Sequence, residues 1–237
     1  MPRLACLLLL WAAVQAGAAE TDADTVFRPF EADYQLTRNG ISVGHTRIRF
    51  ELGDQGDYRY YVESGPNMVL SLFRNDQVEE QSEGRLVRGW PLPLDYLYRR
   101  SGEADRELSL KFDWDSDRVD IQSAGSRWRL AVPSDTLDKL IQQLALSAEL
   151  AAGKREPQFR VADGGLLKTY RYQVVGREDT EVPMGRFETL MVKRYKDDNP
   201  SDYTLWIAPS LGWQPVKILR RYRGTSYQME LESLAVD

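Results

Sequence analysis

The side chains that enzymes most often use for covalent catalysis are scarce in this chain, which has one histidine, His45, and one cysteine, Cys6. A Ser-His-Asp or Cys-His catalyst needs its histidine beside a nucleophile. The sequence contains no Gly-x-Ser-x-Gly elbow, and Cys6 lies within the apolar start of the chain. We therefore interpret His45 as an ordinary residue of a strand edge or loop, and we predict no catalytic residues.

The spacing of Asp113, Asp115 and Asp117 is that of the residues that open a calcium-binding loop. An EF-hand loop also needs glycine at its sixth position and glutamate at its twelfth. Those positions hold Arg118 and Ala124, so we interpret the segment as the tip of a hairpin, where Asp and Ser are favoured. One histidine and one cysteine also give little support to zinc. We expect no metal and no cofactor.

Carboxylates and glycines give equally weak signals. A glycosidase needs two carboxylates that face each other across a cleft. No local motif singles out such a pair among the 36 acidic residues, so a carboxylate-based hydrolase is only our third hypothesis. The pair Gly164-Gly165 lacks the spacing of a phosphate-binding loop and is typical of a turn.

Three arginines near the end of the chain, Arg220, Arg221 and Arg223, flank Tyr222. They are candidates for anion binding, because a guanidinium group forms planar two-point contacts with phosphate. The alternative is a solvated strand face. The formal net charge of −5 argues against nucleic acid as a partner.

The first nineteen residues have the pattern of a secretory signal peptide. A short basic start that ends at Arg3 precedes an apolar run over residues 4–14, and small residues follow at 16–19. The run is too short to span a bilayer. We expect residues 1–19 to be removed, the mature chain to begin near Ala19 or Glu20, and the protein to reside in the periplasm without a transmembrane segment. Cys6 precedes most of the apolar run, so we expect no lipid anchor.

The remaining sequence predicts one β-rich domain over residues 26–237. Hydrophobic residues make up 42% of the chain, which is typical of a folded protein. Apolar and polar residues alternate with period two in segment after segment, as in strands with one buried face. Short polar links favour antiparallel neighbours. We predict a mainly β fold, a curved antiparallel sheet or incomplete β-barrel of roughly ten strands. The clearest alternating segments are 47–52, 58–63, 108–114, 128–132, 170–174 and 227–232.

One segment changes to a helical period, which predicts a helix over about 135–152. Ser134 or Asp135 is suited to cap its start, and Gly153 is suited to its end. A wide sheet needs its apolar face covered, so we expect the helix on the concave face of the sheet. The residues of its main apolar stripe are Leu137, Leu140, Ile141, Leu144 and Ala148.

Apolar residues beyond those needed to cover the sheet are consistent with a ligand cavity. Leu146 and Leu150 lie on the helix face opposite the main stripe, and residues 67–73 form a second, shorter helix candidate. A concave sheet with a helix can enclose an apolar pocket. The alternative is that these residues fill a solid core. The cavity candidates are Met68, Leu72, Phe73, Leu146, Leu150 and Trp206.

The order of motifs in the last third of the chain resembles the bacterial exported family called domain of unknown function 3108. A tyrosine-rich strand at 170–176 precedes a Pro-x-Gly-x-Phe-x-Thr turn at 183–189, a strand around Trp206 and a Pro-Val-Lys strand at 215–217. The resemblance covers most of residues 30–234. It implies a periplasmic protein whose curved sheet is similar to that of lipoprotein-carrier folds, and it supplies no catalytic residues.

The sequence therefore supports three hypotheses from different classes. The first is a non-enzymatic periplasmic protein that binds a hydrophobic or lipid-like ligand, or a protein segment, in its curved sheet. The second is a structural or assembly factor with a solid core that binds an envelope protein. The third is the carboxylate-based hydrolase. An apolar cavity would favour the first over the second, and a buried acidic cluster that opens to solvent would favour the third.

Overall fold

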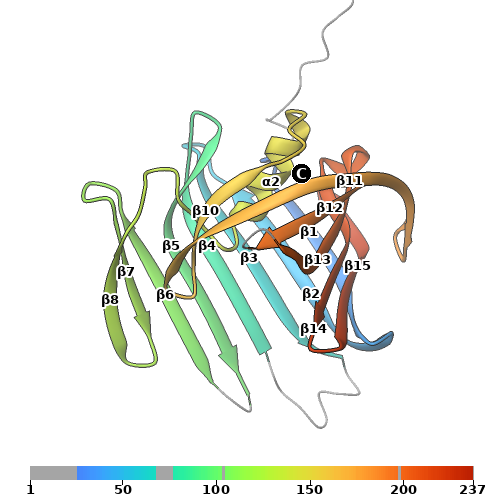
Figure 1. Ribbon diagram of the computed structural model, residues 1–237, viewed down its shortest axis with the longest axis horizontal. Helices are drawn as coiled ribbons and strands as arrows, with labels where there is room; N and C mark the ends of the chain where they lie inside the picture. The colour runs from blue at the N-terminus through green and yellow to red at the C-terminus, as the bar shows by residue number, and fades with distance from the viewer. Residues whose placement is uncertain (1–25, 68–76, 103–104, 197–198, 237) are drawn as a thin grey trace, which may run out of the picture.

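The computed structural model describes residues 26–67, 77–102, 105–196 and 199–236. These residues form one sheet with a single α-helix and a short 3-10 turn (Figure 1). The strands are β1 (Phe30–Arg38), β2 (Ile41–Leu52), β3 (Asp57–Pro66), β4 (Gln77–Val87), β5 (Trp90–Ser101), β6 (Arg106–Asp113), β7 (Arg118–Ser123), β8 (Ser126–Ala131), β9 (Leu137–Asp138), β10 (Gln158–Asp163), β11 (Leu166–Val182), β12 (Gly185–Lys196), β13 (Asn199–Ala208), β14 (Gln214–Tyr222) and β15 (Thr225–Val236). The helix is α2 (Gln142–Ala151) and the 3-10 turn is η2 (Pro209–Leu211).

The strand order is simple, because each strand lies beside its neighbours in sequence except where the chain ends meet. The order runs from β8 down to β1, passes to β15 and continues down to β9. All neighbours are antiparallel except β9 and β10, which are parallel. The first and last strands therefore pair in the middle of the sheet, and β8 and β9 are its two edges.

The fold class is as predicted, but the sheet has 15 strands rather than about ten. Strand β4 shows why alternation underestimates the number. Its inward face has Glu80, Ser82 and Gly84 between Val78 and Leu86, so the apolar alternation is interrupted along most of the strand. Gly84 is required at its position, because a Cβ there would lie 2.3 Å from the backbone oxygen of Leu92. Strand β9 has only two residues, which is too short for any period to show.

Contacts between the two ends of the sheet curl it into an incomplete barrel. The indole of Trp128 on β8 donates a hydrogen bond of 3.3 Å to the backbone oxygen of Gly165, in the turn between β10 and β11. The rings of Trp90 on β5 and Phe159 on β10 stack with centroids 6.4 Å apart. Gly164 and Gly165 have φ of 62° and 83°, as the predicted turn requires.

The helix lies inside the curve of the sheet (Figure 1), but it is shorter than predicted. Residues 137–138 pair with β10 as β9, and α2 begins only at Gln142. The side chain of Asp138 accepts hydrogen bonds from the backbone nitrogens of Leu140 and Ile141 at 2.8 and 2.9 Å. Neither Ser134 nor Asp135 caps the helix, because its start lies further along the chain. Gly153, with φ of 83°, follows its end as predicted.

Burial of the main apolar stripe is confirmed. Leu137, Leu140, Ile141 and Leu144 are all 2% exposed or less. The opposite face of α2 is buried as well, since Leu146 is 1% exposed and Leu150 is 2% exposed. Core residues therefore pack against two opposite faces of the helix.

Some predictions concern parts of the chain that the structure does not describe. The signal peptide over 1–19 and the cavity candidates Met68, Leu72 and Phe73 lie outside the described residues. The short helix proposed for 67–73 does so too, apart from Asn67. Among the described residues, no helix is long and apolar enough to cross a membrane.

We expect Leu140→Ala to lower the free energy of unfolding by about 2–5 kcal/mol, because it leaves a cavity in a closely packed core. Leu146→Ser should lower the free energy of unfolding by at least as much, since it also buries a hydroxyl group among apolar side chains. Chemical denaturation measures both effects. His45→Ala, on the exposed face of β2, is the matched control and should change the stability little. A Leu146→Ser protein as stable as wild type would contradict this placement of the helix.

Candidate functional site

One region of the inner surface of the barrel is charged instead of apolar. Alternation along the strands turns charged and tyrosine side chains inward at positions beside the buried core residues of each strand. We call this group the inner polar cluster. It consists of Glu80 on β4, Tyr98 on β5, Lys139 after β9, Asp163 on β10, Lys168 and Tyr170 on β11, Arg194 on β12 and Tyr203 on β13.

The first part of the inner polar cluster is centred on Glu80. Its carboxylate accepts hydrogen bonds from the Lys139 ammonium group at 2.9 and 3.2 Å and from the Tyr96 hydroxyl at 3.0 Å. The Lys139 ammonium also lies 5.6 Å from the centroid of the Tyr98 ring. Burial alone would lower the pKa of Lys139, but the charge of Glu80 outweighs it and the pKa lies above its ordinary value. This lysine is therefore a fixed cation.

The second part is centred on Asp163, which accepts hydrogen bonds from Lys168 at 2.6 Å and from the Tyr170 hydroxyl at 2.8 Å. Burial alone would raise the pKa of Asp163, but these two hydrogen bonds outweigh it and the pKa lies below its ordinary value. A carboxyl group that remains ionised is a poor general acid. Asp163 thus holds the two side chains in place rather than supplying a proton.

The third part is the guanidinium group of Arg194. It stacks between two tyrosines, 4.6 Å from the ring centroid of Tyr170 and 4.4 Å from that of Tyr203. Such cation–π contacts fix the plane of a guanidinium group. Tyr203 is the register partner of Arg220 on β14, so Arg220 borders the cluster.

The inner polar cluster is accessible to solvent and positively charged. The side chains of Lys139, Lys168 and Asp163 are 38%, 32% and 21% exposed. Two carboxylates, Glu80 and Asp163, face three cations, and Arg220 adds a fourth at the border. The arrangement can therefore hold an anion beside aromatic rings. We call this accessible part of the interior the mouth of the barrel.

Asp138, adjacent to the cluster, is fully buried. The Ser82 hydroxyl donates a hydrogen bond of 2.5 Å to it, and the hydroxyls of Ser82 and Tyr58 lie 3.3 Å apart. Burial raises the pKa of Asp138 to about 6, although the hydrogen bonds from Ser82 and the backbone favour its ionised form. Its oxygen atoms have no access to solvent, so its role is to join β4 to the start of α2.

The structure separates the cavity candidates of the sequence from this site. Leu146 and Leu150 are packed in the core. Trp206 lies on the other face of β13, where its indole donates a hydrogen bond to Glu178 and the ammonium group of Lys217 lies 5.3 Å from its ring centroid. These three side chains therefore do not line one pocket.

The anion-binding candidates are only partly brought together. Arg220 and Arg223 lie over the ring of Tyr222 at 5.6 and 5.1 Å, and Arg221 is exposed beside them on the hairpin of β14 and β15. Of the three arginines, Arg220 is the one placed next to Tyr203 in the inner polar cluster.

The other residues considered from the sequence, His45 and Asp113, lie away from the inner polar cluster, on a strand surface and in a hairpin turn. His45 lies exposed on β2, opposite Gln35 and Gly65. Asp113 is in the predicted hairpin tip, where its carboxylate accepts hydrogen bonds from the backbone of Asp115 and from the backbone and hydroxyl of Ser116. Within the described ranges, no group of three or more acidic, histidine or cysteine side chains is arranged to hold a metal ion.

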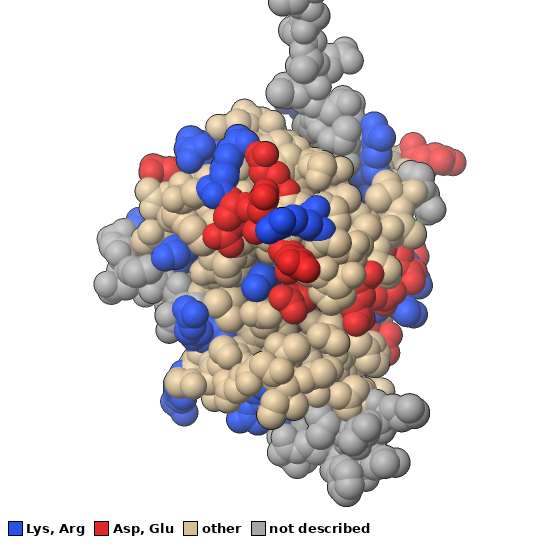
Figure 2. All heavy atoms as spheres, turned by 90° about the vertical axis from the view of Figure 1, so that its right-hand side faces the viewer, with Lys and Arg blue, Asp and Glu red and all other residues tan. Residues whose placement is uncertain are grey.

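The outer surface carries both signs of charge. Figure 2 shows acidic and basic side chains intermingled on the face that lies on the right-hand side of Figure 1. Ion pairs join neighbouring strands on the outer surface, for example Arg59 with Glu83 and Arg49 with Glu31, both at 2.6 Å. Two grooves also open on the outer surface, with volumes of about 770 Å³ over β4–β8 and about 830 Å³ over β15, β1 and β2.

Sequence reasoning missed most of the inner polar cluster. Its charged residues lie 59 positions apart for Glu80 and Lys139, and only 5 apart for Asp163 and Lys168. A signal was present in the alternation, because Lys168 and Arg194 occupy the inward parity of strands whose other inward residues are apolar or aromatic. A charged residue at an inward position of a strand is unusual, so it indicates a candidate site even where no motif is present.

Comparison with known proteins shows the relationship and the fold. The family model described as "Protein of unknown function (DUF3108)" matches residues 31–232. A crystal structure of a beta-barrel-like protein of the domain of unknown function DUF1849 from Brucella abortus has 12% identity and a TM-score of 0.61, covering 89% of this chain and 98% of that chain. The complex of MucA and MucB from Pseudomonas aeruginosa has 10% identity and covers 92% of each chain, with a TM-score of only 0.20. No curated protein sequence matches the chain.

Asp138 predicts a pH dependence of stability. Its folded pKa of about 6 lies above its ordinary value of 3.8, so the stabilisation of its protonated form is fully present below about pH 4 and is lost as the pH rises through 6. A shift of this size corresponds to about 3 kcal/mol. Asp138→Asn, which keeps the shape of the protonated form, should remove this part of the dependence. Chemical denaturation of both proteins at several values between pH 4 and pH 8 measures the free energy of unfolding. The same dependence of this free energy on pH in both proteins would contradict the prediction.

Proposed function

Because this chain belongs to the DUF3108 family, whose function is unknown, we infer its role from its own geometry and propose that it is an exported, non-enzymatic binding protein whose mouth receives an anionic ligand. The observation that supports this proposal is the inner polar cluster. Charged side chains from four strands and the β9–α2 connection converge there, although a curved sheet of this kind normally fills its inner face with apolar residues. The proposal concerns a ligand that bears a phosphate or carboxylate group.

The chemistry of the cluster supports an anion as the ligand. Glu80 and Asp163 are each engaged by a lysine and a tyrosine, which leaves the positive charge in excess. Arg194 is held flat between two rings, which reduces the entropy that the arginine loses when it binds a ligand. A guanidinium group fixed in this way is suited to planar two-point contact with a carboxylate or phosphate.

The same geometry is the reason to propose a non-enzymatic role. A carboxylate-based hydrolase needs one carboxyl group with a raised pKa that reaches its substrate. Asp138 has the raised pKa but no access to solvent, whereas Asp163 has access but a lowered pKa. Neither residue combines the two properties.

A second candidate function is an assembly factor of the cell envelope with a solid core. The observation that favours it is the burial of both apolar faces of α2, with Leu146 and Leu150 packed where an apolar ligand would have to lie. The two candidate functions differ in their use of the mouth of the barrel. The first binds a ligand there, whereas an assembly factor with a solid core would not need the mouth. Lipid-like ligands remain compatible with the first proposal if their anionic group enters the mouth.

Export is part of the proposal and is supported by the start of the chain alone. We expect protein produced with its full sequence in a Gram-negative host to lose residues 1–19, or nearly so, and to be recovered from the periplasmic fraction without a lipid group. Intact-mass analysis measures the cleavage. Retention of Met1, or a diacylglyceryl group on Cys6, contradicts this expectation.

The mouth is tested by the substitution Arg194→Gln, which removes the charge and keeps most of the side-chain length. Native mass spectrometry of protein isolated from the periplasm should show a bound anionic molecule on the wild type, with its occupancy reduced about tenfold or more in the variant. Arg177→Gln on the outer part of β11, where Arg177 pairs with Glu188 at 2.8 Å, is the matched control and should keep the ligand. Equal occupancy in all three proteins would show that the mouth is not the site.

A further inference from the structure

The edge strand β8 has unused backbone groups along its outer side. It pairs only with β7, through a hairpin whose two turn residues, Ala124 and Gly125, both have positive φ. In such a hairpin Ser126, Trp128 and Leu130 exchange backbone hydrogen bonds with β7. The bond from the nitrogen of Val132 to the oxygen of Asp117 continues this alternation.

The remaining residues of β8 therefore point their backbone groups away from the sheet. These residues are Arg127, Arg129 and Ala131, and in the described part of the chain no backbone hydrogen bond is formed to their outward side. Figure 1 shows β8 at the left-hand border of the molecule with no strand beyond it. A row of free N–H and C=O groups is a template for another strand.

The side chains of the edge define the chemistry of a partner. Arg127 and Arg129 face outward, and Arg129 pairs with Asp120 at 2.5 Å while Arg127 makes no ion pair with the described residues. On the inner face, Trp128 is 38% exposed and Leu130 is partly exposed. A strand that pairs here meets positive charge on one face and apolar surface on the other.

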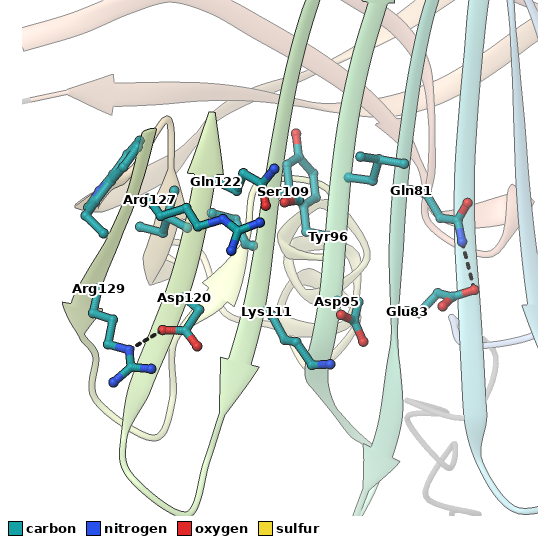
Figure 3. A pocket seen from close by; sticks show the side chains of 14 residues that line it. Gln81, Glu83, Asp95, Tyr96, Ser109, Lys111, Asp120, Gln122, Arg127 and Arg129 are labelled. Carbon is teal, nitrogen blue, oxygen red and sulfur yellow. Dashed lines mark hydrogen bonds and ion pairs between the residues drawn. The ribbon is translucent and has the colours of Figure 1, made fainter. Parts of the chain in front are cut away.

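A groove beside the edge adds to this surface. It has a volume of about 770 Å³ and lies on the outer face of β4–β8. Figure 3 shows Arg127 reaching across β7 toward Gln122 and Ser109, with the bonded pair of Asp120 and Arg129 below it. The side chains of an added strand that face outward would enter this groove next to Arg127.

We propose that the free edge of β8 is a docking site for an extended segment of a partner protein in which acidic residues alternate with apolar ones. The segment adds to the sheet as a sixteenth strand, and its acidic side chains pair with Arg127 and Arg129. A second copy of this chain is a poor occupant, since antiparallel pairing of two β8 edges brings arginines together, and like charges on neighbouring strands repel.

A synthetic peptide of alternating glutamate and valine, with the 6-residue length of β8, tests the proposal. The measurement is amide hydrogen exchange by NMR with and without the peptide. We expect exchange at Arg127, Arg129 and Ala131 to slow by about tenfold or more, because their amides become hydrogen-bonded. Exchange at Trp128 and Leu130, which already bond to β7, should change little.

Charge is tested separately by reversal. Arg127→Glu should weaken binding of the glutamate peptide about tenfold and strengthen binding of a peptide of alternating lysine and valine. Arg186→Glu, at an exposed position on β12, carries the same change of charge and should leave both affinities unchanged. Absence of binding, binding without slower exchange at the three edge amides, equal affinity for both peptides, or dimerisation of the chain through β8 would each overturn the proposal.

Discussion

The hydrogen bonds of Asp138 hold the two distant parts of the sheet together. Ser82 on β4 donates to one carboxyl oxygen, and the backbone nitrogens that precede α2 donate to the other. In the order of the sheet, β4 and β9 are far apart, so these bonds close the barrel rather than extend a ladder. A carboxyl group without access to water is tolerated only when hydrogen-bonded, and here both oxygens are engaged.

This closure divides the inner surface into two regions of different chemistry. In the first region, aromatic and aliphatic side chains pack closely, as the rings of Phe30, Phe50 and Tyr60 do at centroid distances of 5.9–6.3 Å. Beyond Asp138, the pairs of Lys139 with Glu80 and of Lys168 with Asp163 remain partly exposed. Partial hydration avoids most of the desolvation penalty that fully buried ion pairs incur.

An incomplete barrel also leaves edges, and the two edges of this sheet are treated differently. Strand β9 is two residues long and lies against β5 and β4, so it offers no template for pairing. Strand β8 is longer and exposed, and it carries arginines on its outer face, where charge disfavours pairing between edges. The indole of Trp128 meanwhile covers Gly165, where a Cβ would lie within 2.4 Å of the ring. The edge is thus fixed in position while its outer side stays free.

The sequence alone determined the features that depend on neighbours along the chain. Alternation predicted a mainly β fold, the glycine and aspartate turns at 113–117 and 164–165 were recognised, and the helical stripe predicted the burial of Leu140 and Leu144, because each pattern has a local period. Only the tertiary structure decided the number of strands, the late start of α2 and the inner polar cluster. Glu80, Lys139 and Arg194 come from strands and connections far apart in sequence, and their proximity follows from how the sheet closes, which no local period records.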